Sequence, residues 1–363
     1  MKKNNFKNII VGTGFSAAIS KLIIGKDSLV IGNYDHKIFL NNKDFFRREN
    51  IECNKLFSKK VFSFGSLNFT LFKGVFHDHF GIGGNSNIWG GHINLKKFSS
   101  KKLYCFERKG INFQKLDFKT TGTKTNNLKI KQMQNKKNKI LNIDDFNIKI
   151  KNGFIHYFYS KNGRIFLGIK YPHKKKINEI KVKRIFLCTG AIQLLDLLYR
   201  SKLLKDGDLI QFSEFEHKFI LKFTFSKFEK NCTTIRYHIS RSIGHFLGFQ
   251  YFSNFLKLLK FLPICIDQNF YKKKKKIKLI LKNNTLEEYN FNKNSYSKFG
   301  DSIHYCDLKI NGIKINNFLK KVNPNIHGFG MPFVNQIDPG PISNDIMLDI
   351  LKKLNILGLN ENK

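Results

Sequence analysis

Acidic residues are scarce in this sequence, because only 26 Asp and Glu stand against 65 Lys and Arg in 363 residues. There are six Pro and a single Trp, and we find no uninterrupted apolar run of the ~20 residues that a membrane-spanning helix needs. The six Cys form no CxxC or similar pairing, which argues against a zinc site and against a disulfide framework. Reduced thiols favour a cytoplasmic protein.

The resulting net charge of +39 has more than one explanation. Strongly basic proteins bind nucleic acids or anionic membranes. Here the Lys residues are spread along the chain and accompany abundant Asn, Ile and Phe, which share A/T-rich codons, so drift of an A/T-rich genome explains the bias without a ligand. Arg is sparse and no nucleic-acid motif accompanies the charge, so we expect no nucleic-acid partner.

A basic apolar stretch leaves a peripheral membrane contact open. Residues 251–266 are apolar, with Lys257 and Lys260 three positions apart, and the lysine run 272–276 follows. A helix there would have a basic edge suited to a membrane surface or an anionic substrate. We favour the simpler interpretation, which is a core helix or strand followed by a solvated hairpin loop at 272–276.

The pattern of apolar residues predicts a mixed α/β protein of about two domains. A strand at 8–11, a helix at 18–24 and a strand at 28–31 form a β-loop-α-β opening. Several short strands follow, with a hairpin turn at Lys161, Asn162 and Gly163. The expected strands are 146–150, 154–159, 164–169 and 180–187, and further helices are expected at 191–199 and 343–354.

The first motif is Gly12-x-Gly14-x-x-Ala17, which stands between the first strand and the first helix. This is the setting of a dinucleotide fingerprint, in which Gly12 permits a tight turn and Gly14 lets a pyrophosphate approach the backbone. Ala17 is small enough for close helix–strand packing, and the phosphate charge would lie at the helix N-terminus. Gly32 occupies the place of the acid expected for the ribose hydroxyls. Asn33 or Asp35 could substitute for it, although their spacing differs from the usual one.

Two further motifs are rich in small residues. Residues 83–91 read Gly83-Gly84-Asn85-Ser86-Asn87-Ile88-Trp89-Gly90-Gly91, which places the only Trp between glycine pairs. Residues 188–193 read Cys188-Thr189-Gly190-Ala191-Ile192-Gln193 and stand between a strand and a helix. Taken alone, each is also compatible with an ordinary glycine-rich loop or strand-to-helix turn.

Together these segments resemble the glucose–methanol–choline (GMC) family of FAD-dependent oxidoreductases. Residues 337–347, with Gly340 and Pro341, are similar to the family's closing segment, and all four segments occur in the family's order. The resemblance implies a Rossmann-like FAD-binding domain with an inserted, smaller and mainly β substrate domain. We expect the FAD domain at 1–100, 145–204 and 300–363, the substrate domain at 205–299, and an irregular insertion at 101–144.

The resemblance also implies which residues hold the cofactor. They are Gly12, Gly14, Ala17, Gly83, Gly84, Asn85, Ser86, Asn87, Trp89, Gly90, Thr189, Gly190, Ala191, Gly340 and Pro341. Relatives that bind FAD covalently use a His where this chain has Ile88, so we expect non-covalent FAD. No metal is expected, because a strand would place His77 and His79 on the face opposite Asp78.

The expected reaction removes a hydride from a CH–OH group to flavin N5, while a base takes the hydroxyl proton. The segment around His304 resembles the family's segment that carries this base, and His327, which we expect in a polar turn, is its rival. The substrate would be a sugar, another small alcohol or a glycan, with an unidentified electron acceptor. The alternatives are a degenerate flavin fold without turnover and a basic protein that binds membranes or nucleic acids.

Overall fold

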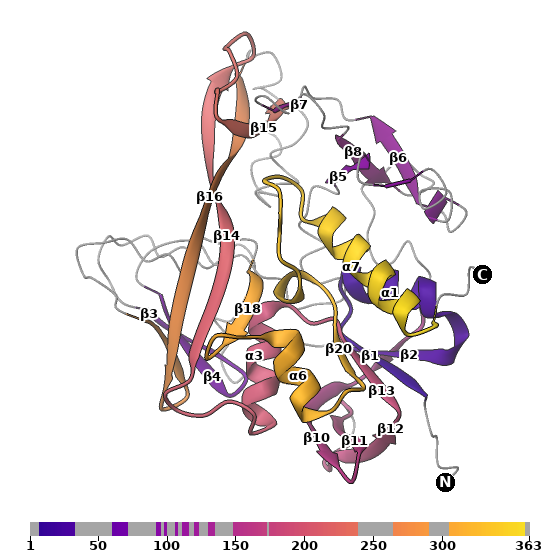
Figure 1. Ribbon diagram of the computed structural model, residues 1–363. Helices are drawn as coiled ribbons and strands as arrows, with labels where there is room; N and C mark the ends of the chain where they lie inside the picture. The colour runs from indigo at the N-terminus through magenta and orange to yellow at the C-terminus, as the bar shows by residue number, and fades with distance from the viewer. Residues whose placement is uncertain are drawn as a thin grey trace.

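The computed structural model describes twelve ranges of the chain. They are residues 7–32, 60–71, 92–95, 98–99, 106–107, 111–115, 120–122, 130–134, 148–172, 174–238, 264–289 and 305–359. Figure 1 shows a parallel sheet with helices around it and a tall antiparallel arm beside them. In these ranges no helix is both long and apolar enough to cross a membrane.

A five-stranded parallel sheet forms the first layer. Its strands lie in the order β20-β13-β1-β2-β9, and every neighbouring pair is parallel. All four residues of β1 are buried, as expected of a parallel strand covered on both faces. The bounds are β1 (Asn8–Val11), β2 (Ser28–Gly32), β9 (Ile150–Asn152), β13 (Arg184–Leu187) and β20 (Ile326–Gly328).

Alternating side chains of the sheet enter two hydrophobic cores. Ile9 and Val11 belong to the core that includes helix α3 and an antiparallel three-stranded meander, whereas Ile10 belongs to the core that includes helices α1 and α7. Burying each such side chain contributes about 1.5–3 kcal/mol. The covering elements are α1 (Phe15–Ile24), α3 (Ala191–Arg200), α7 (Ser343–Ile356), β10 (Phe154–Lys161), β11 (Arg164–Lys170) and β12 (Asn178–Val182).

The second large unit is a nine-stranded, mostly antiparallel sheet. Strands β14 and β16 pair over nearly their whole lengths and form the arm that rises in Figure 1. The sheet comprises β3 (Lys60–Phe64), β4 (Leu67–Leu71), β7 (Thr120–Gly122), β14 (Leu209–Phe223), β15 (Cys232–His238), β16 (Ile264–Lys282), β17 (Thr285–Glu288), β18 (Cys306–Ile310) and β19 (Ile313–Lys314).

A small antiparallel sheet and several short elements complete the described structure. The small sheet has the order β5-β8-β6 and lies near α7 in Figure 1. Its strands are β5 (His92–Asn94), β6 (Asn112–Lys115) and β8 (Ile130–Gln134), and the remaining elements are η1 (Gly25–Asp27), α6 (Ile315–Val322) and η8 (Met331–Phe333).

Most expected elements are confirmed. The β-loop-α-β opening forms as β1, α1 and β2, and the expected hairpin joins β10 to β11. Asn162 and Gly163 have φ angles of 52° and 70°, which is the left-handed pair that a tight hairpin turn requires. The mixed α/β class with a parallel sheet is likewise confirmed.

Two local expectations are wrong, and of the strand expected at 146–150 the described residues show only its last position, Ile150, which begins β9. The stretch 180–187 is not one strand, because the chain leaves the meander after Val182 and enters the parallel sheet at Arg184, with the exposed Lys183 between them. The lysine run 272–276 is not a hairpin loop but the middle of β16. Lysines fit there because Lys274 lies over the Phe215 ring and donates to Asn335. Lys275 lies opposite Glu214 in the register of β14 and β16. The apolar residues 251–263 lie outside the described ranges.

The sheets also cross the expected domain boundaries. The antiparallel sheet recruits β3 and β4, which precede residue 100, and β18 and β19, which follow residue 300. The insertion 101–144 was expected to be irregular, yet its described residues include strands β6, β7 and β8. These pairings connect segments distant in the sequence, which local patterns do not reveal.

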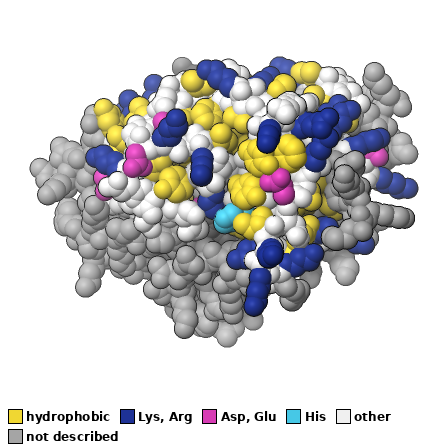
Figure 2. All heavy atoms as spheres, turned by 90° about the horizontal axis from the view of Figure 1, so that it is seen from below, with side chains coloured by type: hydrophobic (Ala, Val, Ile, Leu, Met, Phe, Trp, Pro, Cys, Tyr) yellow, Lys and Arg dark blue, Asp and Glu magenta, His cyan; other side chains and the backbone are white. Residues whose placement is uncertain are grey.

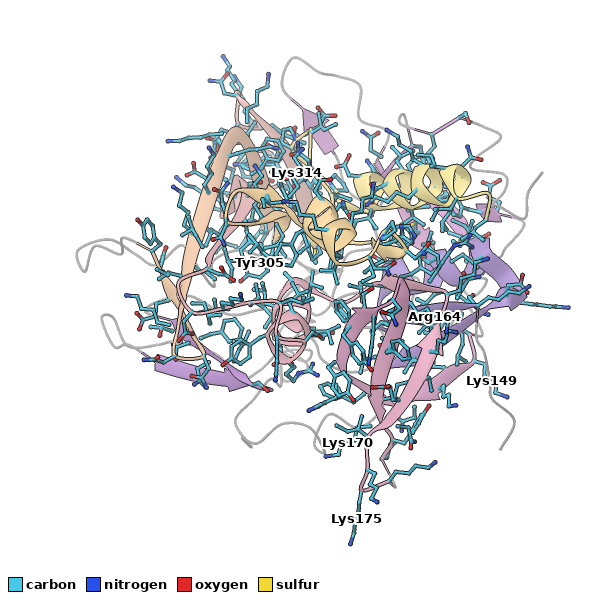
Figure 3. The ribbon with its side chains drawn as sticks, turned by 60° about the horizontal axis from the view of Figure 1, so that its bottom comes forward. Lys149, Arg164, Lys170, Lys175, Tyr305 and Lys314 are labelled. Carbon is cyan, nitrogen blue, oxygen red and sulfur yellow. The ribbon has the colours of Figure 1, made fainter. Side chains whose placement is uncertain are left out.

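The basic charge is spread over the surface. Figure 2 shows Lys and Arg side chains at many places on one face, with apolar side chains between them. Lys170 and Lys175 project outward from the meander region in Figure 3. Lys151 and Lys174 both lie over the Tyr171 ring, at 5.0 and 5.7 Å from its centroid. This distribution agrees better with compositional drift than with one basic stripe.

A buried carboxylate ties the antiparallel sheet to helix α3. Asp196 is 1% exposed, accepts a 2.8 Å hydrogen bond from the Ser66 backbone nitrogen and pairs with Arg200 at 2.8 Å. Arg200 also donates to the backbone oxygens of Ile155 and His156 in β10. Asp196 therefore connects the β3–β4 turn, α3 and, through Arg200, the meander.

We predict that Asp196→Ala lowers the free energy of unfolding by about 3 kcal/mol, because it leaves the buried Arg200 without its counter-ion. The exposed Asp206 provides the matched control, and Asp206→Ala should change stability little. Urea denaturation followed by circular dichroism measures both. Equal stability of the two variants would contradict this role of Asp196.

Candidate functional site

Three strand ends meet at one edge of the parallel sheet. The Gly12 nitrogen donates to Ile31 at 3.0 Å, the Cys188 nitrogen to Val11 at 2.8 Å, and the Phe329 nitrogen to Leu187 at 2.9 Å. The chain passes from β1 to β2 and β9 on one side, then returns to β13 and β20 on the other. The order therefore reverses between β1 and β13, and such switch points bind ligands beyond the carboxyl ends of the strands.

Gly12 is the point of closest approach between the two turns at this switch point. Its φ is +113°, and a Cβ added there would lie 2.6 Å from the Cys188 oxygen and 3.3 Å from the Thr189 nitrogen. Only glycine satisfies both the backbone conformation and the space. The structure thus brings the Gly12–Ala17 motif directly against the Cys188–Ala191 motif, as the resemblance implied.

Both turns lead into helices that begin on glycine. Gly14 is the N-cap of α1 and Gly190 is the N-cap of α3, and neither helix has a side-chain cap or an acidic residue in its first turn. The N-terminal ends of α1 and α3 therefore carry positive partial charge at the same sheet edge. Ala17 is 1% exposed, consistent with its expected role in close packing.

Thr189 contributes a buried hydroxyl at the same place. Its Oγ1 is buried and has no hydrogen-bond partner in the part of the chain that the structure describes. A buried hydroxyl that makes no hydrogen bond costs about 1–3 kcal/mol, so such a group is usually satisfied by a bound molecule or water. The hydroxyl and the two helix ends form a site suited to an anionic, hydrogen-bonding ligand such as a nucleotide phosphate.

The turn after β20 packs on the start of α1. A Cβ at Gly330, which has a φ of +109°, would lie 2.8 Å from Ser16 Oγ. Any larger residue would push against the first turn of α1. Gly330 therefore belongs to the same convergence, although no motif in the sequence pointed to it.

The N-terminal end of α7 is linked to β5. The backbone nitrogen of Asn94 donates to Asn344 Oδ1 at 2.8 Å, and both residues are buried. Strand β5 begins at His92, directly after the glycine-rich motif 83–91. The strand that follows this motif is thus joined through Asn94 to the closing segment, whose helix α7 packs against α1.

The closing segment lies against the antiparallel sheet. Gly340 has a φ of +135° and is buried, and its oxygen accepts a 2.7 Å hydrogen bond from Gln336. The Cγ2 of Thr233 in β15 is 4.0 Å from a Cβ placed at Gly340. Gly340 therefore lies where the closing segment meets the nine-stranded antiparallel sheet, and Pro341 follows it directly.

His327 is not in the polar turn that we expected. The turn ends at Asn325, whose nitrogen donates to Asn323 Oδ1, and His327 lies within β20. Its ring stacks on Phe186 at 5.4 Å, and its Nε2 is buried without a partner. Burial and the cations Arg184, Lys320 and Lys353 lower the pKa of His327 to about 4, so the ring is neutral at pH 7.

The central residues of two expected groups lie outside the described ranges. These are His304 and the members of the glycine-rich motif, namely Gly83, Gly84, Asn85, Ser86, Asn87, Trp89 and Gly90. Tyr305 follows His304 directly and is buried, with its ring centroid 5.3 Å from that of Phe212 in β14. Figure 3 shows Tyr305 between the meander and the arm. The roles of these groups stay predictions.

A pair of residues explains the missing ribose acid. A Cβ at Gly32 would lie 2.0 Å from Thr13 Cγ2, so the Thr13 methyl group fills the space in which a side chain at position 32 would begin. Thr13 is the variable residue between the two glycines of the first motif. The absence of the acid is therefore coupled to Thr13, which sequence motifs did not identify because any residue is allowed there.

Neither a nucleophilic thiol nor a metal cluster forms at the described part of the site. Burial raises the pKa of Cys188 to about 12, so the thiol stays protonated. Its Sγ lies 3.8 Å from Ser20 Oγ in α1. Within the described ranges, no three His, Cys, Asp or Glu side chains are grouped to hold a metal ion.

Comparisons with known proteins give only distant likenesses. No family model and no curated protein matches the chain. The PF1083 protein from Pyrococcus furiosus is 8% identical, with 98% of this chain and 99% of that chain covered and a TM-score of 0.37. CabE, an aromatic hydroxylase from angucycline biosynthesis, is 6% identical, with 98% and 61% covered and a TM-score of 0.35.

The p-nitrophenol 4-monooxygenase PnpA from Pseudomonas putida DLL-E4 is 8% identical, with 78% and 71% covered and a TM-score of 0.30. The chain thus spans less than two thirds of the length of CabE and slightly more than two thirds of the length of PnpA. At these identities and TM-scores, the likenesses do not define the family of this chain.

We predict that Gly32→Ala lowers the melting temperature, because the new methyl group collides with Thr13. Thr13→Ser keeps the hydroxyl and removes Cγ2, so the double variant Thr13→Ser, Gly32→Ala should recover most of the loss. A double-mutant cycle measured by thermal denaturation gives the coupling between the two positions. Purely additive effects would show that this packing does not exclude a side chain at position 32.

We predict that His327 makes the protein sensitive to acid. Its pKa of about 4 lies below the ordinary value of 6.5, so its contribution to stability is full above pH 6.5 and is lost as the pH falls toward 4. His327→Gln should flatten the fall of the melting temperature between these pH values and leave the slope above pH 7 unchanged. If the melting temperatures of the wild type and of His327→Gln fell equally with pH, the lowered pKa of His327 would be contradicted.

Proposed function

We propose that this chain is an FAD-dependent oxidoreductase that acts on a CH–OH group. The observation that carries the proposal is the convergence of two glycine turns at the switch point between β1 and β13. Gly12 there leaves no room for a side chain against Cys188 and Thr189. The GMC resemblance supports the same function through motifs that the chain carries in order.

The residues present fit the adenosine diphosphate part of FAD. The backbones of Gly12 and Gly14 would face the pyrophosphate at the start of α1, and Thr189, Gly190 and Ala191 would contact the same nucleotide at the start of α3. The buried Thr189 hydroxyl offers a hydrogen bond that no group of the described residues uses. The net charge of +39 also favours an anionic cofactor.

The remaining assignments extend this site along the chain. The glycine-rich motif with Trp89 would contact the flavin, and Gly340 and Pro341 would cover it from the closing segment. The nearness of Gly340 to Thr233 in β15 supports the idea that the antiparallel sheet would form one wall of the substrate pocket. Binding is non-covalent, since Ile88 offers no atom for attachment. A metal is not needed for this chemistry.

Bound FAD supplies an acceptor for the hydride of the alcohol carbon. The hydroxyl proton must leave at the same time, and His304 takes it as the general base. His327 is the weaker candidate, because its Nε2 is buried within β20 beside Phe186. The substrate is a sugar, another alcohol or a glycan, and the chain works in the cytoplasm with an electron acceptor that its residues do not identify.

One observation favours a second function, which is flavin binding without turnover. Thr13 excludes the ribose acid from position 32, so part of the usual nucleotide recognition is absent. A protein that keeps FAD in place but has lost the base or the substrate pocket would show the same described site. The experiment below separates the two functions.

We predict that the purified protein shows a flavin absorption spectrum that bleaches anaerobically when an alcohol substrate is added. His304→Ala should keep the colour and abolish the bleaching, and His327→Ala should keep both. Bound flavin that no alcohol from a panel of sugars and polyols reduces would support the degenerate fold. A folded protein that takes up no FAD would contradict both functions.

We predict that Thr189→Val weakens FAD binding by about tenfold, the effect of removing one hydrogen bond to a charged or buried group. Because Thr189 Oγ1 has no protein partner, the melting temperature of the FAD-free protein should not fall. Thr70→Val is the matched control, since Thr70 Oγ1 in β4 is also buried without a partner. Equal FAD affinity of the two variants would remove Thr189 from the site.

A further inference from the structure

An exposed apolar cluster lies at the end of the arm. Leu221, Phe223 and Phe225 are 68%, 54% and 78% exposed, although large apolar side chains are usually buried. The rings of Phe223 and Phe225 stack on each other, with centroids 5.4 Å apart and an interplanar angle of 7°. We refer to residues 221–228 as the arm tip. Exposed apolar patches of this kind mark interaction surfaces.

The arm tip is held in place by a buried ion pair. Arg236 is 2% exposed and forms two hydrogen bonds, of 2.6 and 2.8 Å, with the carboxylate of Asp267, which is 0% exposed. The same guanidinium donates to the backbone oxygens of Thr224 and Ser226 at 3.0 and 2.9 Å. It also lies 3.9 Å from the Phe228 ring centroid.

These contacts fix the turn that presents the two phenylalanines. The Ser226 nitrogen closes the turn with a 2.9 Å hydrogen bond to the Phe223 oxygen. The tip is therefore pre-organised, so its side chains lose little conformational freedom when they meet a partner. The exposed phenylalanines are thus held on an ordered turn, whereas a side chain that is exposed by chance has no such support.

The charge around the arm tip is positive. From residue 218 to residue 231 the chain contains Lys218, Lys222, Lys227 and Lys230 and one acid, Glu229. Glu229 accepts hydrogen bonds from Asn269 at 2.6 Å and Tyr271 at 3.0 Å. The only acid of this stretch is thus occupied within the sheet, and the four lysines set the charge of the tip.

The segment that joins β15 to β16 has the same composition. Its two ends lie at the end of the arm, because His238 pairs with Cys265, and Phe223 pairs with Ile264. Residues 239–263 contain Arg241, Lys257 and Lys260, six aromatic residues and no Asp or Glu. The sequence of this joining segment is therefore apolar and basic, like that of the arm tip.

We propose that the arm tip docks on the surface of an anionic lipid membrane. Phe223, Phe225 and Leu221 would enter the boundary between headgroups and acyl chains, and the lysines would contact anionic headgroups. A second copy of this chain fits less well, because two chains of net charge +39 repel each other. A nucleic acid would use the lysines but would leave Leu221 and the outer Phe225 exposed to water.

Flotation of the full-length protein with lipid vesicles tests this proposal. We expect binding to vesicles of phosphatidylcholine with phosphatidylglycerol, weak binding to phosphatidylcholine alone, and release by salt. The double variant Phe223→Ser, Phe225→Ser should lower the partition coefficient by about tenfold, because it removes most of the exposed apolar area of the tip. Both positions are exposed, so the melting temperature should not fall.

Ile356→Ser is the matched control, because Ile356 is 73% exposed at the end of α7, and this variant should bind vesicles like the wild type. The double variant Lys222→Gln, Lys227→Gln should weaken binding to the anionic vesicles and should leave the weak binding to phosphatidylcholine vesicles unchanged. The proposal would be overturned if the wild type fails to float with anionic vesicles or if the Phe double variant floats equally well. Light scattering that shows a dimer lost in the Phe double variant would instead assign the tip to self-association.

Discussion

The approach of two backbone turns at Gly12 is the constraint on which the described site depends. The parallel register of β1 and β13 places Val11 beside Leu187, so the residues that follow these strands must emerge side by side. Gly12 allows this because it has no Cβ and adopts a positive φ. The glycine N-caps of α1 and α3 then bring two helix ends and the Thr189 hydroxyl to the same edge.

The sequence predicted the parts of this arrangement that local chemistry determines. Strand β1, helix α1, the hairpin at Asn162 and Gly163, and the glycine turns all follow from apolar periodicity and turn-forming residues. The approach of the two turns was expected from a resemblance and not from spacing. Their physical cause, the parallel pairing of strands more than 170 residues apart, becomes visible only in the structure.

The features that the sequence did not predict are long-range contacts. A residue at a variable motif position, Thr13, determines what is allowed at Gly32, and Gly330 is required by Ser16. Residues 272–276 suggested a loop because lysine side chains prefer water. In the structure, the antiparallel pairing of β16 with β14 keeps these residues in an extended strand. In the same way, β3, β4 and β18 join a sheet whose longest strands lie in residues 205–299, the range that the resemblance suggested for a separate domain.

The most direct test of the central claim is a fluorescence titration of the cofactor-free protein with FAD in competition with ADP and FMN. In the proposed function, the site at Gly12 and Thr189 would recognise the adenosine diphosphate part of FAD. We therefore predict saturable binding of one FAD per chain, displacement of FAD by ADP and weak binding of FMN. Binding of FMN as tight as that of FAD, with no displacement by ADP, would contradict the assignment of these turns to the nucleotide.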